Sequence, residues 1–367
     1  MTSRIDAELD AYQIARAMSW RFQLDSFEQE ALVAILATYD AARAEILAAF
    51  QARYATMTDW RSVRAEDVLG EVEAMTAGLR QTLTDQYGAM ATTVGTASLI
   101  EAGAALSLGG LIQVNNVGLA PAQLRQFFRD MPISGRLLDQ WVDASFDATM
   151  QEQMRQALNA GVIQGEGYRP LVKRIEDGFT MARGEATTLT RTFVSAANNA
   201  ARMETYKAND DVVTGWKWIT SGDNLVCMMC LPLHGRTFKL GGGPPIPRHP
   251  RCRCSSIPAT ISWRELGIDI DEFHAEADKW IVRGKVGEDG EIQVRLVGTG
   301  GANPILRISQ HADAQSWYDS LSPAEKRSTG LGPGRIALLD SGKIGIKDLI
   351  GPDFQARTLE QLRGLYP

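Results

Sequence analysis

The chain of 367 residues is poor in cysteine and histidine, with four residues of each. All four cysteines lie in the 28 residues from Cys227 to Cys254, and the other 339 residues contain none. Cysteines that merely fill a hydrophobic core would be scattered, so this clustering indicates one shared local role. The pattern C-x2-C followed by H-x2-C-x-C has the spacing of metal ligands.

The sequence also lacks a long apolar run and a secretory signal. Its most apolar stretch, residues 97–117, is interrupted by Glu101, three glycines and two asparagines, so it falls short of the roughly 20 apolar residues that span a bilayer. The first residues do not show a basic segment followed by an apolar one. We therefore expect no membrane segment and folding in a reducing cytoplasm, where structural disulfides are rare.

Negative charge is in excess, with a net charge of -6, but it is unevenly distributed. Residues 216–254 contain six basic side chains and one acidic side chain, Asp223. Three of the basic residues, Arg248, Arg251 and Arg253, flank the cysteines and are candidates for contact with nucleic-acid phosphates. An ordinary solvated face is the alternative, and an acidic body argues against nucleic-acid binding over the whole surface.

The first 207 residues carry the pattern of successive helices. Apolar residues recur in steps of three and four from Leu32 to Tyr54 and again from Val68 to Val94. Ser26 and Gln29 have capping-box spacing and predict the start of the first helix. Further helices are expected at residues 122–129, 137–160, 168–179 and 183–207. Such stripes favour packing within one chain, with a coiled coil to a partner chain as the alternative.

The pattern changes after Asp210. Residues 212–220 are rich in β-branched and aromatic side chains and predict a strand, whereas the glycine- and proline-rich residues 241–247 predict a loop. Short helices are expected at 262–270 and 271–280, a strand at 291–297, and a helix opening at the capping box of Ser322 and Glu325. The predicted fold class is α+β: a long helical N-terminal region followed by a small mixed α/β C-terminal domain with a Cys/His cluster.

The Cys/His knot, residues 216–258, offers five candidate ligands for a tetrahedral zinc ion: Cys227, Cys230, His249, Cys252 and Cys254. The C-x-C spacing leaves open whether both Cys252 and Cys254 bind. Disulfides and reduced, buried thiols are the alternatives to zinc. A structural ion is favoured over a catalytic one, because no H-E-x-x-H motif is present. His274-x-Glu276 has the form of the H-x-E motif of zinc deaminases, but in those enzymes the motif precedes the cysteine pair. Here it follows the cysteines, so we interpret it as part of an ordinary helix.

The knot and its flanks resemble the phage Mu F-like minor head proteins, also called phage head morphogenesis proteins. The resemblance rests on residues in three segments. In the knot they are Trp216-x-Trp218, Asp223, Cys227-x2-Cys230, Leu233-x-Gly235 and His249-Pro250-x-Cys252-Arg253-Cys254. In the preceding helix they are Leu189-Thr-Arg191-Thr192, Asn198, Ala201, Glu204 and Tyr206. In the C-terminal part they are Trp317, Leu321-Ser-Pro-Ala, Leu331-Gly-Pro-Gly-Arg335 and Asp348-Leu-Ile350.

The resemblance covers residues 165–365 and implies four regions. They are a helical N-terminal region (1–108), a helical region leading into the head-protein domain (122–207), the Mu F-like domain with the knot (210–300) and a C-terminal helical tail (301–367). The sequence departs from the family pattern at Arg191-Thr-Phe193, where the usual glutamate is absent, and in the loose spacer 239–247.

The resemblance implies a minor structural protein of a tailed bacteriophage head. Such a protein would associate with the portal protein, other head proteins and the capsid interior during head assembly and DNA packaging, with packaged DNA as a further partner. It would lie in the virion at the portal vertex, and in the host cytoplasm during assembly.

Two other functional classes stay open. One is a DNA-binding, zinc-containing module. The other is an ejected enzyme or toxin related to ADP-ribosyltransferases or small nucleases, for which Arg191, Glu204, Asp223 and His234 would be the polar residues to test. We expect no enzymatic activity, because no catalytic motif is present and each of these residues has a structural explanation.

Overall fold

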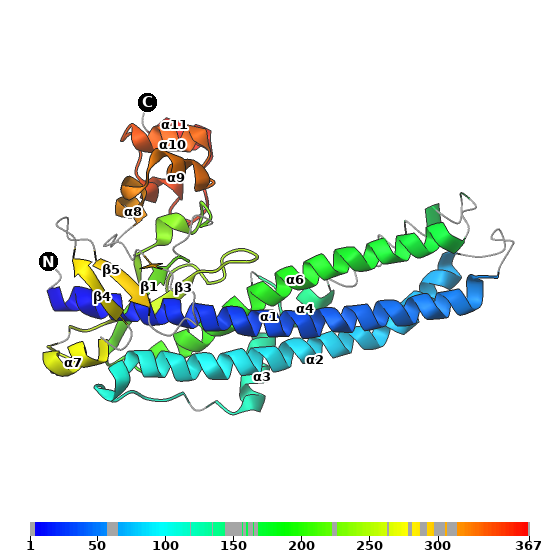
Figure 1. The fold of residues 1–367 in the computed structure, drawn as a ribbon, viewed down its shortest axis with the longest axis horizontal. Helices are drawn as coiled ribbons and strands as arrows, with labels where there is room; N and C mark the ends of the chain where they lie inside the picture. Colours follow the sequence, from blue (N-terminus) through cyan, green and yellow to red (C-terminus); the bar gives the residue numbers. More distant parts are fainter. Residues whose placement is uncertain are drawn as a thin grey trace.

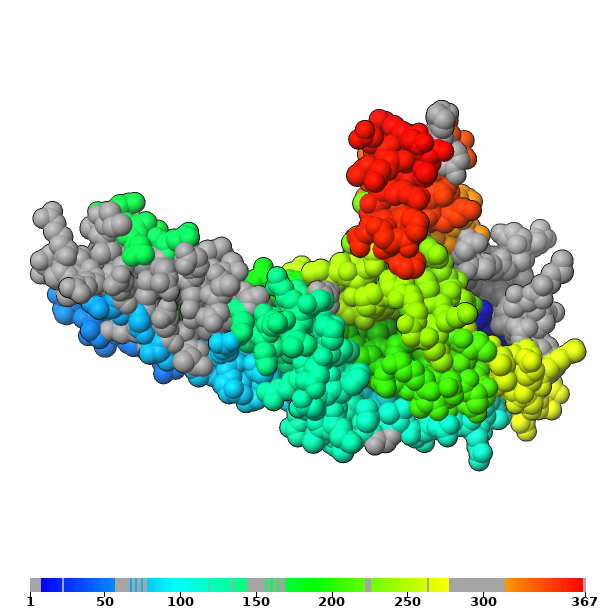
Figure 2. Space-filling view, turned by 180° about the vertical axis from the view of Figure 1, so that it is seen from behind, coloured from blue at the N-terminus to red at the C-terminus, as the bar shows by residue number. Residues whose placement is uncertain are grey.

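A computed structural model describes residues 4–56, 65–117, 119–133, 135–143, 156, 159, 160, 164, 168–221, 226–262, 264–277, 281–286, 292–296, 305–306 and 314–365. The protein is elongated, and its C-terminal helices stand away from the long axis (Figures 1 and 2). Three long helices lie side by side along that axis: α1 (Arg4–Tyr54), α2 (Ala65–Leu106) and α6 (Tyr168–Lys207). We call these three helices the rod.

The remaining elements are short. The α-helices are α3 (Pro121–Asp130), α4 (Leu138–Asp143), α7 (Ile270–Ala277), α8 (Ala314–Ser320), α9 (Pro323–Ser328), α10 (Pro333–Asp340) and α11 (Leu359–Leu365). The 3-10 helices are η2 (Leu108–Gly110), η4 (Leu231–Leu233) and η5 (Ile346–Leu349). The strands are β1 (Val213–Ile219), β2 (Thr237–Lys239), β3 (Ser255–Thr260), β4 (Ile281–Val286), β5 (Ile292–Leu296) and β6 (Ile305–Leu306). This content confirms the predicted α+β class.

The rod has a continuous apolar core that the two sequence stripes supply. Leu83 and Phe193 are fully buried, and the Tyr87 ring meets that of Phe193 edge to face at a centroid distance of 5.9 Å. The Tyr87 hydroxyl donates to the Ala186 carbonyl at 3.2 Å, so its polar end is satisfied inside the core. The stripes therefore pack within one chain, as the favoured interpretation of the pattern predicted.

The predicted helix start at Ser26 is wrong, because α1 is continuous from Arg4 to Tyr54. Residues of α1 before Ser26 are already buried against α6. Trp20 is 6% exposed, and its indole nitrogen donates to Asn198 Oδ1 at 2.9 Å. Tertiary contacts thus keep the chain helical on both sides of Ser26, although the local sequence there has the pattern of a helix start.

The two helices expected at 168–179 and 183–207 are likewise one helix, α6. Phe179 and Ala182 are both buried on the core face, and the intervening residues do not interrupt that face. The helix expected at 137–160 corresponds to α4 at its beginning, and most of the rest lies outside the described residues.

Strand β1 is the centre of a three-stranded antiparallel sheet in the order β2-β1-β3. It occupies the strand predicted at 212–220. Trp216 pairs with Phe238 on β2 and with Pro258 on β3. A Cβ at Gly215 would lie 2.3 Å from the Phe238 carbonyl oxygen, so the close pairing of β1 with β2 requires glycine there.

A second sheet has the order β4-β5-β6, and β5 confirms the strand expected at 291–297. Of the two short helices expected at 262–280, only the second forms, as α7, and residues 264–267 are a turn. At α9 the capping box is confirmed: the Glu325 amide donates to Ser322 Oγ at 3.4 Å, and Ser322 N donates to Glu325 Oε2 at 2.8 Å.

The N-terminal end of α1 packs against the C-terminal half of the chain, where it lies beside α7 and the strands (Figure 1). Tyr12 meets Phe273 of α7 edge to face at 6.0 Å, and Glu8 Oε2 lies 2.7 Å from His274 Nε2. Lys217 of β1 forms an ion pair with Asp10. The rod and the knot are therefore held together by side-chain contacts as well as by the continuity of the chain.

One helical segment, Gly78–Leu106, is long and apolar enough to cross a membrane by length and composition, contrary to the sequence expectation. Half of its most apolar window is buried inside the protein. Its buried side chains, including Leu83 and Tyr87, belong to the rod core. A core helix of a bundle passes the same length and composition test, and we interpret the segment in that way.

Candidate metal centre

The first arm of the centre is the C-x2-C turn that follows β1. The Cys230 amide donates to the Cys227 carbonyl at 3.1 Å, and the Leu231 amide donates to the same oxygen at 3.0 Å. These bonds close a turn that leads directly into η4. The turn brings two sulfur atoms, which the chain separates by two residues, to one side of the backbone.

The second arm, residues 249–254, lies between the glycine- and proline-rich loop and β3. The Cys252 amide donates to the His249 carbonyl at 3.1 Å, and Arg251 has a positive φ of 60°. This tight turn places His249 and Cys252 toward the first arm. Cys254 precedes β3 directly, so pairing of β3 with β1 fixes its position.

Helix α6 of the rod supports the second arm from behind. The Arg251 amide donates to Thr192 Oγ1 at 3.0 Å, and its guanidinium donates to Thr188 Oγ1 at 2.8 Å. Asn199 Nδ2 donates to the Cys254 carbonyl at 3.2 Å. The arm is therefore positioned by polar residues of α6 as well as by the sheet.

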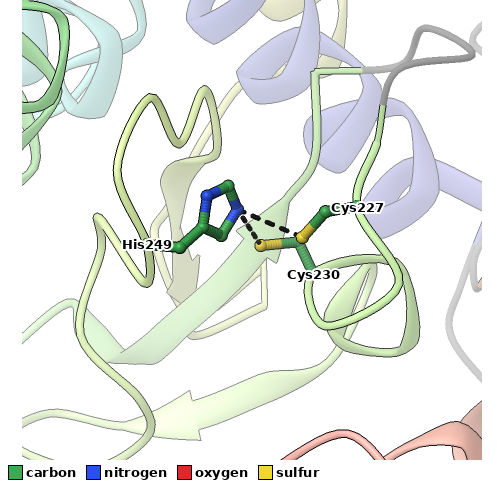
Figure 3. A group of neighbouring side chains, drawn as sticks. All are labelled: Cys227, Cys230 and His249. Carbon is green, nitrogen blue, oxygen red and sulfur yellow. Dashed lines mark hydrogen bonds between the residues drawn. The ribbon is translucent and has the colours of Figure 1, made fainter. Parts of the chain in front are cut away.

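The donor atoms of the two arms converge. His249 Nε2 lies 3.1 Å from Cys227 Sγ and 3.4 Å from Cys230 Sγ, with the imidazole ring turned toward both sulfurs (Figure 3). Cys230 Sγ lies 4.0 Å from Cys252 Sγ. Two groups of three donors form, Cys227 with Cys230 and His249, and Cys230 with Cys252 and Cys254, each with all donor atoms within 4.8 Å. Cys230 belongs to both groups.

The cluster favours thiolates over thiols at two positions. The pKa of Cys227 is lowered to about 4, because the thiolate accepts hydrogen bonds from Cys230 and from His249. The pKa of Cys252 is also lowered, with Cys230 as the main hydrogen-bond donor. The pKa of His249 is raised to about 10 by the sulfurs of Cys227 and Cys252. Negative charge on sulfur is thus stabilised where a cation would sit.

The donor set fits a zinc ion. A tetrahedral site with zinc–sulfur bonds of about 2.3 Å and zinc–nitrogen bonds of about 2.0 Å separates neighbouring donors by about 3.5–3.8 Å. The distances from His249 Nε2 to Cys227 Sγ and Cys230 Sγ are 3.1 and 3.4 Å, and that from Cys230 Sγ to Cys252 Sγ is 4.0 Å, so each lies within about 0.4 Å of that range. All four cysteines are free, and Cys230, Cys252 and Cys254 are buried. The disulfide alternative is therefore not adopted in this structure.

The three arginines that flank the donors have separate surroundings. Arg248 donates to the Phe354 carbonyl, and Arg251 is bonded to the α6 threonines described above. Arg253 is half-buried. Two of the three candidate phosphate contacts are thus already occupied by structural hydrogen bonds.

The polar residues considered for catalysis do not form one site among the described residues. Arg191 Nε lies 3.0 Å from Glu28 Oε1, and Glu204 pairs with Lys207 at 2.8 Å. His234 Nδ1 accepts from the Thr220 amide at 3.2 Å. Asp223 lies outside the described residues.

His274 and Glu276 both lie on α7, as expected for an ordinary helix. Neither belongs to a metal-compatible group in the part of the chain that the structure describes. Glu276 is buried, and its Oε1 accepts a hydrogen bond at 3.5 Å from the hydroxyl of Tyr12, which lies on the N-terminal part of α1.

Sequence reasoning missed the polar residues of α6 that support the donors. Thr188, Thr192 and Asn199, which bond to the second arm, recur at intervals of four and seven residues before the knot, and the last two are buried. A buried polar stripe on a helix indicates a polar partner across it. That periodicity was the available signal.

The family model described as Phage Mu protein F like protein matches residues 152–257. The matched segment contains α6, β1, both arms of the centre and the first half of β3. It confirms the resemblance seen in the knot and in the preceding helix, and it ends before the C-terminal helices. Neither the curated proteins nor the solved structures contain a match.

Proposed function

We propose that this chain, whose residues 152–257 match the Phage Mu protein F like family, is a minor structural component of a tailed bacteriophage head, associated with the portal inside the capsid. The observation that carries this proposal is the family match over residues 152–257, which covers the complete donor set and its supporting helix. In this role the protein joins the head during assembly and stays there while DNA is packaged. Its place is the portal vertex of the virion.

The shape of the molecule supports a role in assembly. The rod presents long helical faces, and the C-terminal helices project away from its long axis (Figure 2). Helical faces of this kind are ordinary docking surfaces for other proteins. The net charge of -6 also keeps most of the surface from being captured by packaged DNA.

We propose that the centre holds one structural zinc ion through Cys227, Cys230, His249 and Cys252. A bound zinc ion would cross-link the two arms and contribute its binding free energy to folding. Cys230 is central, since it lies in both donor groups. In this proposal Cys254 does not bind the ion and keeps a buried thiol, and its backbone carbonyl accepts a hydrogen bond from Asn199. The ion has no catalytic part in this proposal.

We also propose that the protein is not an enzyme. Arg191 and Glu204 already have ion-pair partners, and His234 accepts a hydrogen bond from Thr220. Each residue therefore has a structural use that accounts for its presence. A role as a DNA-binding module is less well supported, because Arg248 and Arg251 are engaged within the protein.

The test is the composition of purified heads. A phage lacking this protein would be complemented with wild-type protein, with Cys230→Ser, or with the control variant Met228→Leu, which keeps every donor. We expect the wild type and Met228→Leu in heads, co-purifying with the portal protein, and a strong reduction for Cys230→Ser. Wild-type protein that accumulates in lysates but is absent from heads would refute the proposal.

A further inference from the structure

A cavity of about 640 Å³ lies between the knot and the C-terminal helices. One wall comes from η4 and the residues after it, through Pro232, His234 and Arg236. The opposite wall comes from the start of α8, from η5 and from the loop that follows η5. The cavity therefore exists only because the C-terminal segment folds back onto the knot. Its volume lies within the range of small-molecule sites, about 300–1,000 Å³.

The lining of the cavity carries an excess of positive charge. Three cationic side chains line it, Arg236, Lys347 and Arg357, against one carboxylate, Asp348. The Asp348 carboxylate is used locally, because its Oδ2 accepts from the Gly345 amide at 2.8 Å. None of the three cations has an ion-pair partner among the described residues.

Two of these cations are held in place without being neutralised. The Arg236 guanidinium lies over the rings of Phe238 and Phe354, 5.8 and 5.6 Å from their centroids. Arg357 Nη1 donates to the backbone carbonyl of Asp348 at 2.9 Å. Aromatic faces and carbonyl oxygens position a guanidinium but leave its full charge for a ligand.

Two more arginines stand behind the cavity wall. Arg248 donates to the Phe354 carbonyl, and Arg335 donates to the Arg357 carbonyl at 3.0 Å. The Nε atom of each is buried without a hydrogen-bond partner among the described residues. With Arg236, Lys347 and Arg357 these two arginines make five cationic side chains in or beside residues 347–357, against two carboxylates in that segment, Asp348 and Asp353. The hydrogen bonds of Arg248 and Arg335 go to neutral carbonyl oxygens, so both guanidinium groups keep their charge and raise the local positive potential.

His234 lines the same wall, and its ring makes hydrogen bonds within the protein. Its Nδ1 accepts from the Thr220 amide at 3.2 Å, so Nδ1 is the unprotonated nitrogen. The proton is then on Nε2, which makes that nitrogen a hydrogen-bond donor.

We propose that this cavity binds phosphate groups. Guanidinium forks match the oxygens of phosphate, and a dianionic phosphomonoester would balance the two excess positive charges of the lining, which a monoanionic carboxylate would not. The phosphomonoester belongs either to a free mononucleotide or to the 5′-phosphorylated end of a nucleic-acid strand, and both present the same dianionic group to the cavity, whereas an internal phosphodiester carries a single charge. The inference does not depend on the portal-associated role proposed above.

The proposal is tested by calorimetric titration of the full-length, metal-replete protein with adenosine 5′-monophosphate, with adenosine, and with a short single-stranded oligonucleotide that carries a 5′-phosphate. Each is repeated with Lys347→Glu and Arg236→Gln, and with Lys343→Glu as the control, an exposed lysine of the same segment that does not line the cavity. Zinc content and near-ultraviolet circular dichroism show that each variant is folded.

We expect the monophosphate to bind with a dissociation constant of about 1 mM or tighter and adenosine not to bind. Lys347→Glu and Arg236→Gln should each weaken binding by at least about fivefold, with Lys343→Glu unchanged. Oligonucleotide binding with the same dependence on the variants, without monophosphate binding, would assign the phosphate to a strand. Equal binding by all three variants, or no binding of either phosphate ligand, would overturn the proposal.

Discussion

The rod and the knot differ in how their cohesion is distributed. In the rod, fully buried apolar side chains such as Leu83 and Phe193 repeat along three helices, and each contributes its own share of burial. In the knot, two turns and three short strands converge on five donor atoms, with Cys230 shared by both donor groups. We therefore expect a single substitution in the rod to remove only part of its stability, whereas a single substitution of a shared donor should disrupt the whole knot.

The largest expected effect is at the shared donor. Replacing Cys230 by serine should abolish zinc binding, with a loss on the order of 10 kcal/mol of metal-binding free energy, because zinc contributes directly to the folding of such sites. Elemental analysis should fall from about one zinc per chain to none. The near-ultraviolet signal of Trp216 and Trp218 should collapse while the helical signal of the rod persists.

The matched control for this variant is Cys254→Ser. We propose that Cys254 does not bind the ion, so this variant should retain zinc. A wild-type preparation that is free of metal yet fully folded would remove the contrast between the rod and the knot.

An intermediate effect is expected in the rod. Phe193→Ala removes a fully buried ring that contacts Tyr87, and it should lower the free energy of unfolding by about 3–5 kcal/mol. Urea unfolding followed by helical circular dichroism measures the change. Zinc content should not change, because the ring is not a donor.

Val33→Ala is the control for Phe193→Ala, since Val33 of α1 is 69% exposed. It should change the free energy of unfolding by no more than about 0.5 kcal/mol. If Phe193→Ala released the zinc as well, the rod and the knot would have to be treated as one cooperative unit.

The smallest effect is expected at an exposed ion pair of the rod. Arg183 of α6 pairs with Asp40 of α1, with side-chain exposures of 34% and 49%. Solvent screens such a pair, so Arg183→Gln should cost about 0–1 kcal/mol by the same urea measurement. A loss as large as that of Phe193→Ala would mean that charge, and not burial, holds the rod together.

Local patterns in the sequence predicted a large part of the fold. The stripe from Val68 to Val94 lies within α2, and the residues after Asp210 form β1. The capping box at Ser322 opens α9 because its hydrogen bonds span only three residues. The same signature failed at Ser26, where burial of Trp20 against α6 continues the helix. A local signal decides a helix end only where tertiary contacts are weak.

The candidate centre was predictable in its donors but not in its supports. Cys227, Cys230 and His249 were selected by spacing, and they meet in space. The hydrogen bonds from Arg251 to Thr188 and Thr192 cross about 60 residues of sequence, and no local pattern specifies them. Likewise, the phosphate cavity requires η5 to lie against η4, more than 100 residues earlier in the chain.

Periodicity and ligand spacing are properties of neighbouring residues, so the α+β class, the helical stripes and the clustered donors can all be predicted from the sequence. Three features are seen only in the folded chain: α1 and α6 are continuous helices, α6 supports the second arm of the knot, and the C-terminal segment closes a cationic cavity against the knot. These features depend on which distant surfaces bury one another, and burial is a property of the whole folded chain.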